Sequence, residues 1–243
     1  MTTDYLQLMQ DALNQRNEEE ATNVAVKAFE EQPENEHLLA VMCSVLFDSN
    51  INCYGLLLLF TERFPNSLYP IRVYIAQILC DNFQFDNATS EARYFLRLLY
   101  DFELFTQDKD PRMKEFMSKA FILLTSVYTG LGARSYTKRV LEVAQPFVST
   151  IWQGHYQEEI ENLAKDLEDS ALVELDEQWE AFWSTGANFE AVYEVCKVHQ
   201  CTEMVLRVEL LHKEFQKDAN YQLNENELFQ VVLVNSEQEY LLG

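Results

Sequence analysis

The chain has 243 residues and 48% of them are hydrophobic, a share that supports a buried core and argues against a disordered chain. Its 40 acidic and 18 basic residues give a formal net charge of −22, which disfavours binding to bare nucleic acid or to an anionic membrane. Only 6 glycines and 5 prolines are present, so long helices joined by short turns are favoured.

The N-terminus and the cysteines bear on the compartment. Residues 1–5 contain no basic stretch followed by an apolar one, so we expect no secretory signal. The longest apolar run, Tyr54–Phe60, is shorter than the roughly 20 residues that a membrane span needs. The 5 cysteines are odd in number and irregularly spaced, which argues against a disulfide framework. We therefore expect a soluble, cytoplasmic protein.

Small and apolar residues recur along the first hundred residues. Ala21, Ala25 and Ala28 share one face of a predicted helix that Pro33 ends. The position of Ala21 recurs as Gly55 and Ala88, at intervals of 34 and 33 residues. Three further sets occupy equivalent positions on the preceding helices: Leu8, Met42 and Ile75; Ala12, Leu46 and Leu79; and Met9, Cys43 and Ala76. This period predicts three helical hairpins.

The alanine spacing, the closing proline and the period resemble those of tetratricopeptide repeats (TPR). The tryptophan-like position near the start of each repeat instead holds Tyr5, Leu39 and Arg72. The resemblance implies an all-α fold, an α-solenoid of antiparallel helical hairpins wound into a right-handed superhelix. Residues 1–101 would form three TPR-like hairpins. Residues 102–243 would form longer hairpins that continue the solenoid and pack as its C-terminal cap.

Beyond the repeats, apolar periodicity predicts helices over about 111–129, 134–152, 155–183, 188–199 and 202–217, the third of them continuous or broken. The tail has conflicting signals. Asn224 and Glu227 are spaced as a capping pair, which favours helix. The run Val231–Val234 is β-branched and favours strand. We choose helix for 228–234, because a lone strand would have no sheet to join.

Charge is unevenly distributed over the second half. Residues 109–139 hold 7 of the 18 basic residues, whereas residues 157–180 hold ten acidic residues and one base. In one interpretation the two segments are neighbours that partly neutralise each other or face water. In the other, the acidic face binds a basic partner and raises its association rate.

The residue types of catalytic and metal sites are present, but their spacing is poor. Cys196, His199 and Cys201 could supply zinc ligands or a nucleophile, yet a structural zinc site needs four ligands. The Glu-x-x-His spacing of di-iron bundles occurs at Glu34–His37 and Glu209–His212, positions unsuited to a shared core. We therefore assign no catalytic residue, metal ligand or cofactor, and predict that the chain is not an enzyme.

The family resemblance also implies a binding groove lined by the first helix of each repeat. The matching partner-binding positions are Leu6, Gln10, Leu13, His37, Ala40, Ser44, Phe47, Val73 and Gln77. The Lys, Asn and Arg residues that grip acidic chaperone tails in some family members are replaced by Leu6, Gln10, Val41, Pro70 and Tyr74. The groove would instead suit an extended peptide or an amphipathic helix.

The sequence thus favours a non-catalytic protein–protein interaction scaffold or adaptor. Its partner would be another protein, with a basic or amphipathic segment that binds the groove or the acidic face. Three alternatives stay open: a dedicated chaperone-like or regulatory subunit of one partner, as in secretion systems; a metal- or ligand-binding helical enzyme; and self-association through the oppositely charged hairpins.

Overall fold

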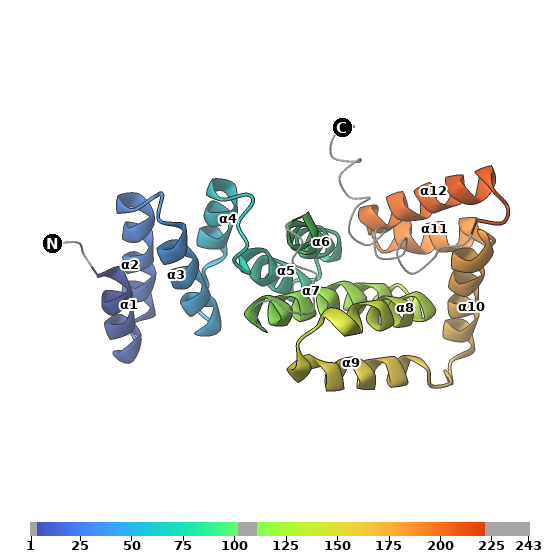
Figure 1. Ribbon diagram of the computed structural model, residues 1–243, viewed down its shortest axis with the longest axis horizontal. Helices are drawn as coiled ribbons and strands as arrows, with labels where there is room; N and C mark the ends of the chain where they lie inside the picture. The colour runs from blue at the N-terminus through green and yellow to red at the C-terminus, as the bar shows by residue number, and fades with distance from the viewer. Residues whose placement is uncertain (1–3, 102–110, 222–243) are drawn as a thin grey trace.

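The structure is a computed structural model that describes residues 4–101 and 111–221. These residues form twelve α-helices and one 3-10 turn, and no strand (Figure 1). In chain order the helices are α1 Tyr5–Asn14, α2 Glu18–Glu31, α3 Glu36–Asp48, α4 Tyr54–Arg63, α5 Ile71–Asp81, α6 Phe85–Asp101, α7 Pro111–Gly130, α8 Arg134–Ala144, η1 Gln145–Phe147, α9 Thr150–Leu163, α10 Ser170–Thr185, α11 Phe189–Val198 and α12 Thr202–Lys217. The predicted all-α fold is confirmed for the described residues.

Short polar side chains begin the first three helices. The carboxylate of Asp4 and the amide oxygens of Asn17 and Asn35 each accept a backbone N–H from the first turn of α1, α2 and α3, at 3.1, 3.1 and 3.2 Å. Such caps satisfy backbone donors that have no partner inside the helix. Neighbouring helices then pack as hairpins: α1 on α2, α3 on α4, and α5 on α6.

Among the helices that the structure describes, five end in the same turn, with a left-handed residue and two backbone hydrogen bonds that reach back into the helix. After α5, the N–H of Gln84 donates to the carbonyl of Leu79 at 2.9 Å, and the N–H of Phe83 to that of Cys80 at 3.0 Å. This pattern is the Schellman motif. The left-handed residues after α1, α3, α5, α7 and α11 are Arg16, Asn50, Phe83, Gly132 and Gln200. The first three are 34 and 33 residues apart, the same intervals as in the sequence period.

Two hydrophobic clusters form the core and meet at α5. Ile71, Ile75 and Leu79 belong to a cluster that also contains residues of α1 to α4 and Ala88 of α6. Val73 and Ala76 belong to the cluster that extends to α12. Figure 1 shows the corresponding arrangement, with α1 to α4 at one end of the elongated chain and α10 to α12 at the other. The boundary predicted at residue 101 adjoins residues outside the described ranges and stays a prediction.

The predicted packing positions of the repeats are mostly buried. Ala21, Ala25 and Ala28 are fully buried on α2. Two of the three sets of equivalent positions are also buried throughout: Met9, Cys43 and Ala76, and Ala12, Leu46 and Leu79. Most of the core positions that the period predicts are therefore buried.

Two predicted packing positions are wrong. Leu8 is 46% exposed, while its counterparts Met42 and Ile75 are buried. The reason is that α1 packs mainly against α2 and α3, with no described helix before it. Gly55 is also exposed, and a Cβ added there would meet nothing within 4 Å. It is the second residue of α4, whereas Ala21 is the fourth residue of α2, so the two do not face equivalent neighbours.

The continuous helix predicted over 134–152 is also wrong. Pro146 has no N–H to extend α8, and the chain passes through the turn η1 before α9 begins. The segment predicted over 155–183 is broken, the second of the two forms expected. The side chain of Asp169 accepts the N–H of Ala171 at 2.8 Å and thereby starts α10.

Three other predictions agree with the structure to within one residue: 111–129 corresponds to α7, 188–199 to α11 and 202–217 to α12. The helix chosen for 228–234 lies outside the described residues. Within the described ranges, no helix is both long and apolar enough to cross a membrane.

Candidate functional site

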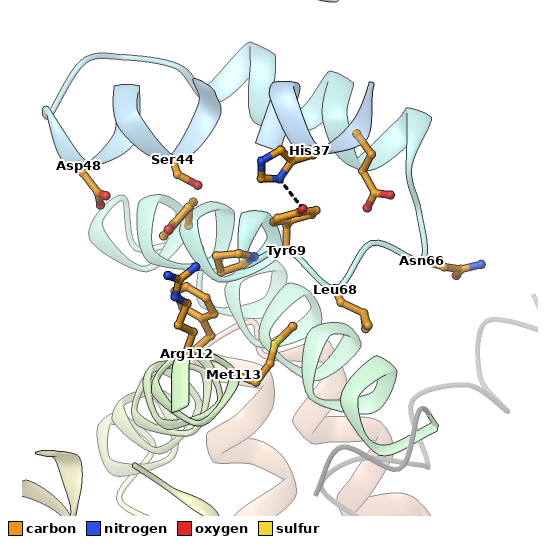
Figure 2. Close-up of a pocket in the computed structure, with 12 residues that line it drawn as sticks. His37, Ser44, Asp48, Asn66, Leu68, Tyr69, Arg112 and Met113 are labelled. Atoms are coloured by element: carbon orange, nitrogen blue, oxygen red, sulfur yellow. Dashed lines mark hydrogen bonds between the residues drawn. The ribbon is translucent and has the colours of Figure 1, made fainter. Parts of the chain in front are cut away.

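The first helices of successive hairpins share one face of the molecule. α3 contacts α5, and α5 contacts α7. Between them lies a hollow of about 770 Å³, which the segment joining α4 to α5 also borders (Figure 2). His37 and Ser44 line it from α3, Tyr74 from α5, and Met113 and Phe116 from α7. Its size is in the range of ligand-binding clefts.

A second, smaller hollow of about 160 Å³ adjoins the first, and Tyr74 lines both. Phe47 of α3, Gln77 of α5 and Ile122 of α7 border it, and α9 adds Trp152. We call the two hollows together the α3–α5–α7 groove. Aromatic side chains thus line the groove from four different helices.

A polar contact fixes one side of the larger hollow. The Nδ1 atom of His37 and the hydroxyl of Tyr69 lie 2.8 Å apart, and their rings are tilted at 45° with centroids 6.0 Å apart. Figure 2 shows this contact between α3 and the segment that leads into α5. It ties the start of α3 to that segment and holds the Tyr69 ring at the hollow.

Tyr74 is the centre of the groove. Its ring stacks on Phe47, with centroids 4.3 Å apart and planes at 18°. Burial raises the pKa of the Tyr74 hydroxyl; the hydrogen bond with Ser44 lowers it, while the charges of Asp48 and Glu115 raise it further. The hydroxyl therefore stays protonated at neutral pH, next to two carboxylates.

The nine predicted partner-binding residues fall into three groups. His37 and Ser44 line the larger hollow, and Phe47, Val73 and Gln77 line the smaller one. Ala40 is fully buried, and so it lies in the core beneath the groove and not on its surface. Leu6, Gln10 and Leu13 are on α1 and line neither hollow.

The sequence prediction missed the contribution of α7 and α9. Arg112, Met113 and Phe116 line the larger hollow, and Lys119 and Trp152 the smaller one. The signal that could have found the α7 residues is the helix predicted over 111–129, which begins the longer hairpins expected after the three repeats. Extending the groove positions by one hairpin would have included them.

The candidate zinc or nucleophile residues do not converge. Cys196 and Cys201 are buried, whereas His199 is exposed. Burial, and then the neighbouring Cys201, raise the pKa of the Cys196 thiol, which opposes formation of the thiolate that ligation or attack requires. Among the described residues, no group of three or more His, Cys, Asp or Glu side chains is placed to hold a metal ion.

The two Glu-x-x-His pairs are engaged separately. His37 contacts Tyr69, as described above. His212 stacks on Phe189 with centroids 3.9 Å apart, and its Nε2 lies 2.8 Å from the amide nitrogen of Gln216. Glu34 lies in the turn before α3 and His37 on α3, whereas Glu209 and His212 both lie on α12. The two histidines are thus engaged in separate contacts.

The basic and acidic segments are neighbours in space. Arg139 of α8 pairs with Glu180 of α10 at 2.5 Å. The guanidinium of Arg134 donates to the carbonyls of Asn162 and Leu163 at the end of α9, at 3.1 and 3.0 Å. Asp176 accepts the N–H of Ser135 at 3.0 Å. These contacts favour the interpretation in which the two segments partly neutralise each other.

Comparison of the chain with protein-family models, curated proteins and solved structures finds no match.

Proposed function

We propose that the chain is a non-catalytic scaffold, an α-solenoid of TPR-like hairpins that binds a segment of another protein along the α3–α5–α7 groove. The observation that carries this proposal is the pair of adjoining hollows, lined by the first helices of three successive hairpins. We place the protein in the cytoplasm, which suits five cysteines that form no disulfide.

The shape and lining of the groove support an elongated protein ligand. Two hollows that share Tyr74 offer successive places for side chains of one segment. Tyr69 and Phe116 line the first hollow, and Trp152 the second. Aromatic side chains are enriched at the centres of protein interfaces, where they add large contact areas at low entropic cost.

The one serine–histidine combination on the α3 side of the groove does not have the geometry of a nucleophile and its base. Ser44 donates its hydroxyl proton to the carbonyl of Ala40 at 2.9 Å. His37 lies seven residues before Ser44 on the same helix, about 10 Å away along the axis at 1.5 Å per residue. A serine and a histidine must approach within about 3 Å to work as nucleophile and base, so this pair is too far apart.

Site-specific crosslinking in cell extract tests the proposal. A photoreactive amino acid is placed at Gln77 in the groove, and as a matched control at Leu58, which is 42% exposed on α4 outside both hollows. We expect a discrete protein adduct from position 77 that disappears when Ser44→Trp fills the larger hollow, and no such adduct from position 58.

Adducts that form equally from both positions, or that survive Ser44→Trp, would contradict a groove-binding scaffold. Leu58→Trp serves as the control for the added indole. Circular dichroism of each variant establishes that the helices are intact before adducts are compared.

A further inference from the structure

The wall that α3 contributes to the groove has two carboxylates and no Lys or Arg. Glu36 lines the larger hollow from the first turn of α3, and Asp48 lines it from the last residue. Among the described residues, no Lys or Arg forms an ion pair with either carboxylate. Figure 2 shows Asp48 at one end of α3, beside the hollow.

The position of Asp48 works against the stability of the helix. The C-terminal end of a helix carries a partial negative charge, so a carboxylate there is repelled and a cation is favoured. α3 has no basic residue in its last turn, and α5 likewise ends on an acid, Asp81, without one. A ligand that brings positive charge to this end of the groove would remove the repulsion.

Aromatic faces lie beside these carboxylates. Tyr74 is only 5% exposed and stacks on Phe47, the residue before Asp48. Tyr69 and Phe116 line the same hollow. Aromatic rings attract ammonium and guanidinium groups through their negative faces. The partly exposed rings of Tyr69 and Phe116, with the carboxylates in the same hollow, therefore form a site that suits a cation on an apolar stem.

Positive charge within the groove comes from α7, on the opposite wall. Arg112 lines the larger hollow and Lys119 the smaller one, and Lys119 lies 3.9 Å from Glu115. The α3 wall, in contrast, has Glu36 and Asp48 as its Asp and Glu residues, together with His37, and no Lys or Arg. The net charge of −22 adds a long-range field that draws cationic segments toward the molecule.

We propose that the occupant of the α3–α5–α7 groove is a segment of a partner protein that carries lysine or arginine, with a cationic side chain beside Asp48 and an apolar one against Tyr74 and Phe116. This inference rests on the proposed scaffold function and specifies the chemistry of its ligand. Glu36 provides a second anionic contact about 18 Å along the helix, 12 residues at 1.5 Å each. That separation corresponds to five or six residues of extended chain.

The test begins with a random dodecapeptide library displayed on phage and selected on the full chain. The most enriched sequence is then synthesised with a fluorescent label, and its binding is measured by anisotropy. We expect enriched sequences to contain Lys or Arg together with an aromatic or large aliphatic residue, and binding to weaken as salt is raised.

Two isosteric variants separate a local contact from net charge. Asp48→Asn should weaken binding of the labelled peptide about tenfold, as expected for loss of one charge-assisted hydrogen bond. Asp166→Asn removes the same charge from an exposed position between α9 and α10 and should change binding by less than about twofold. Equal effects of the two variants would overturn the inference.

The remaining outcomes distinguish this inference from the scaffold function. Neutral or acidic peptides whose binding is lost with Ser44→Trp would overturn the cationic ligand and leave a groove-binding scaffold in place. Peptides that bind regardless of Ser44→Trp, or a library without enrichment, would overturn both.

Discussion

Replacing Gly132 by alanine should destabilise the protein strongly, because two effects add at this residue. Gly132 is the left-handed residue of the turn after α7, with φ of 77°, a conformation that disfavours a side chain by about 1–2 kcal/mol. A Cβ there would lie 2.3 Å from Cδ2 and 2.8 Å from Cγ of Leu175. Overpacking of this kind costs about 1–3 kcal/mol, so we expect a loss of about 2–5 kcal/mol.

Urea denaturation followed by circular dichroism and tryptophan fluorescence measures this loss. Trp179 is a local reporter, because its indole N–H donates to the carbonyl of Leu131 at 3.1 Å, next to the substituted turn. The matched control is Gly154→Ala on α9, where the added Cβ meets nothing within 4 Å. Alanine is the better helix former, so the control should gain about 0.5–1 kcal/mol. A midpoint for Gly132→Ala equal to that of the unmodified protein would refute the turn geometry.

Three further substitutions test other features of the fold. Phe83 is 81% exposed with φ of 60°. Phe83→Gly relieves the strain of this conformation but makes the unfolded chain more flexible, so we expect the free energy of unfolding, measured with urea, to rise by about 0.5–1 kcal/mol. Tyr128→Phe removes the buried hydroxyl to which Arg93 donates at 2.6 Å, and urea denaturation should show a loss of about 1–3 kcal/mol. Burial raises the pKa of the Cys43 thiol to about 12 and that of Cys53 to about 11, from 9.0. The stability that these neutral thiols contribute is therefore fully present below pH 9 and is lost as pH rises through 11–12, at up to about 1.4 kcal/mol per pH unit for each thiol. The urea midpoints at pH 8 and pH 10.5 should therefore differ less for Cys43→Ala than for the unmodified protein.

Much of the helical pattern could be predicted because it depends on local spacing. The buried alanines Ala21, Ala25 and Ala28 identify the packed face of α2 without knowledge of its neighbours. The residues that close the hairpins could not be identified in the same way. Arg16 and Phe83 are left-handed, a conformation that sequence rules assign to Gly or Asn. The hydrogen bonds of the turn and the packing of the following helix impose it there.

The residue at which a helix begins also could not always be predicted from the local sequence. α8 follows Ala133, which offers no capping oxygen, and the carboxylate of Asp176 on α10 accepts the N–H of Ser135 instead. A cap from 41 residues away has no local sequence signal. The break before α9 did have one, Pro146, and the prediction of a continuous helix gave too little weight to the proline.

In the candidate site, too, some residues could be predicted from local spacing and others depend on long-range packing. His37, Ser44 and Gln77 could be placed on a common face from the repeat register alone, and they border the groove. The hollows also need α7 and α9, whose positions depend on long-range packing. Tyr156 of α9, for example, donates to the carbonyl of Ser118 on α7 at 3.0 Å. The register cannot reveal such a contact, and for that reason Trp152 was missed.

The placement of cations at helix ends links the fold to the proposed ligand. Arg63 donates to the carbonyl of Phe29 near the end of α2 at 3.0 Å, and Arg134 does the same for α9. Lys197 and Lys217 lie in the last turns of α11 and α12. The chain thus places a cation at the ends of these four helices, as the helix dipole favours.

The groove helices α3 and α5 lack such a cation and end on Asp48 and Asp81, as α6 outside the groove ends on Asp101. If these carboxylates served the fold, neutralising Asp48 would lower its stability. If they serve a cationic ligand, Asp48→Asn should raise the stability by about 0.3–1 kcal/mol while it weakens peptide binding. A packing defect would lower both quantities, so opposite changes in stability and binding would separate a ligand contact from a structural one.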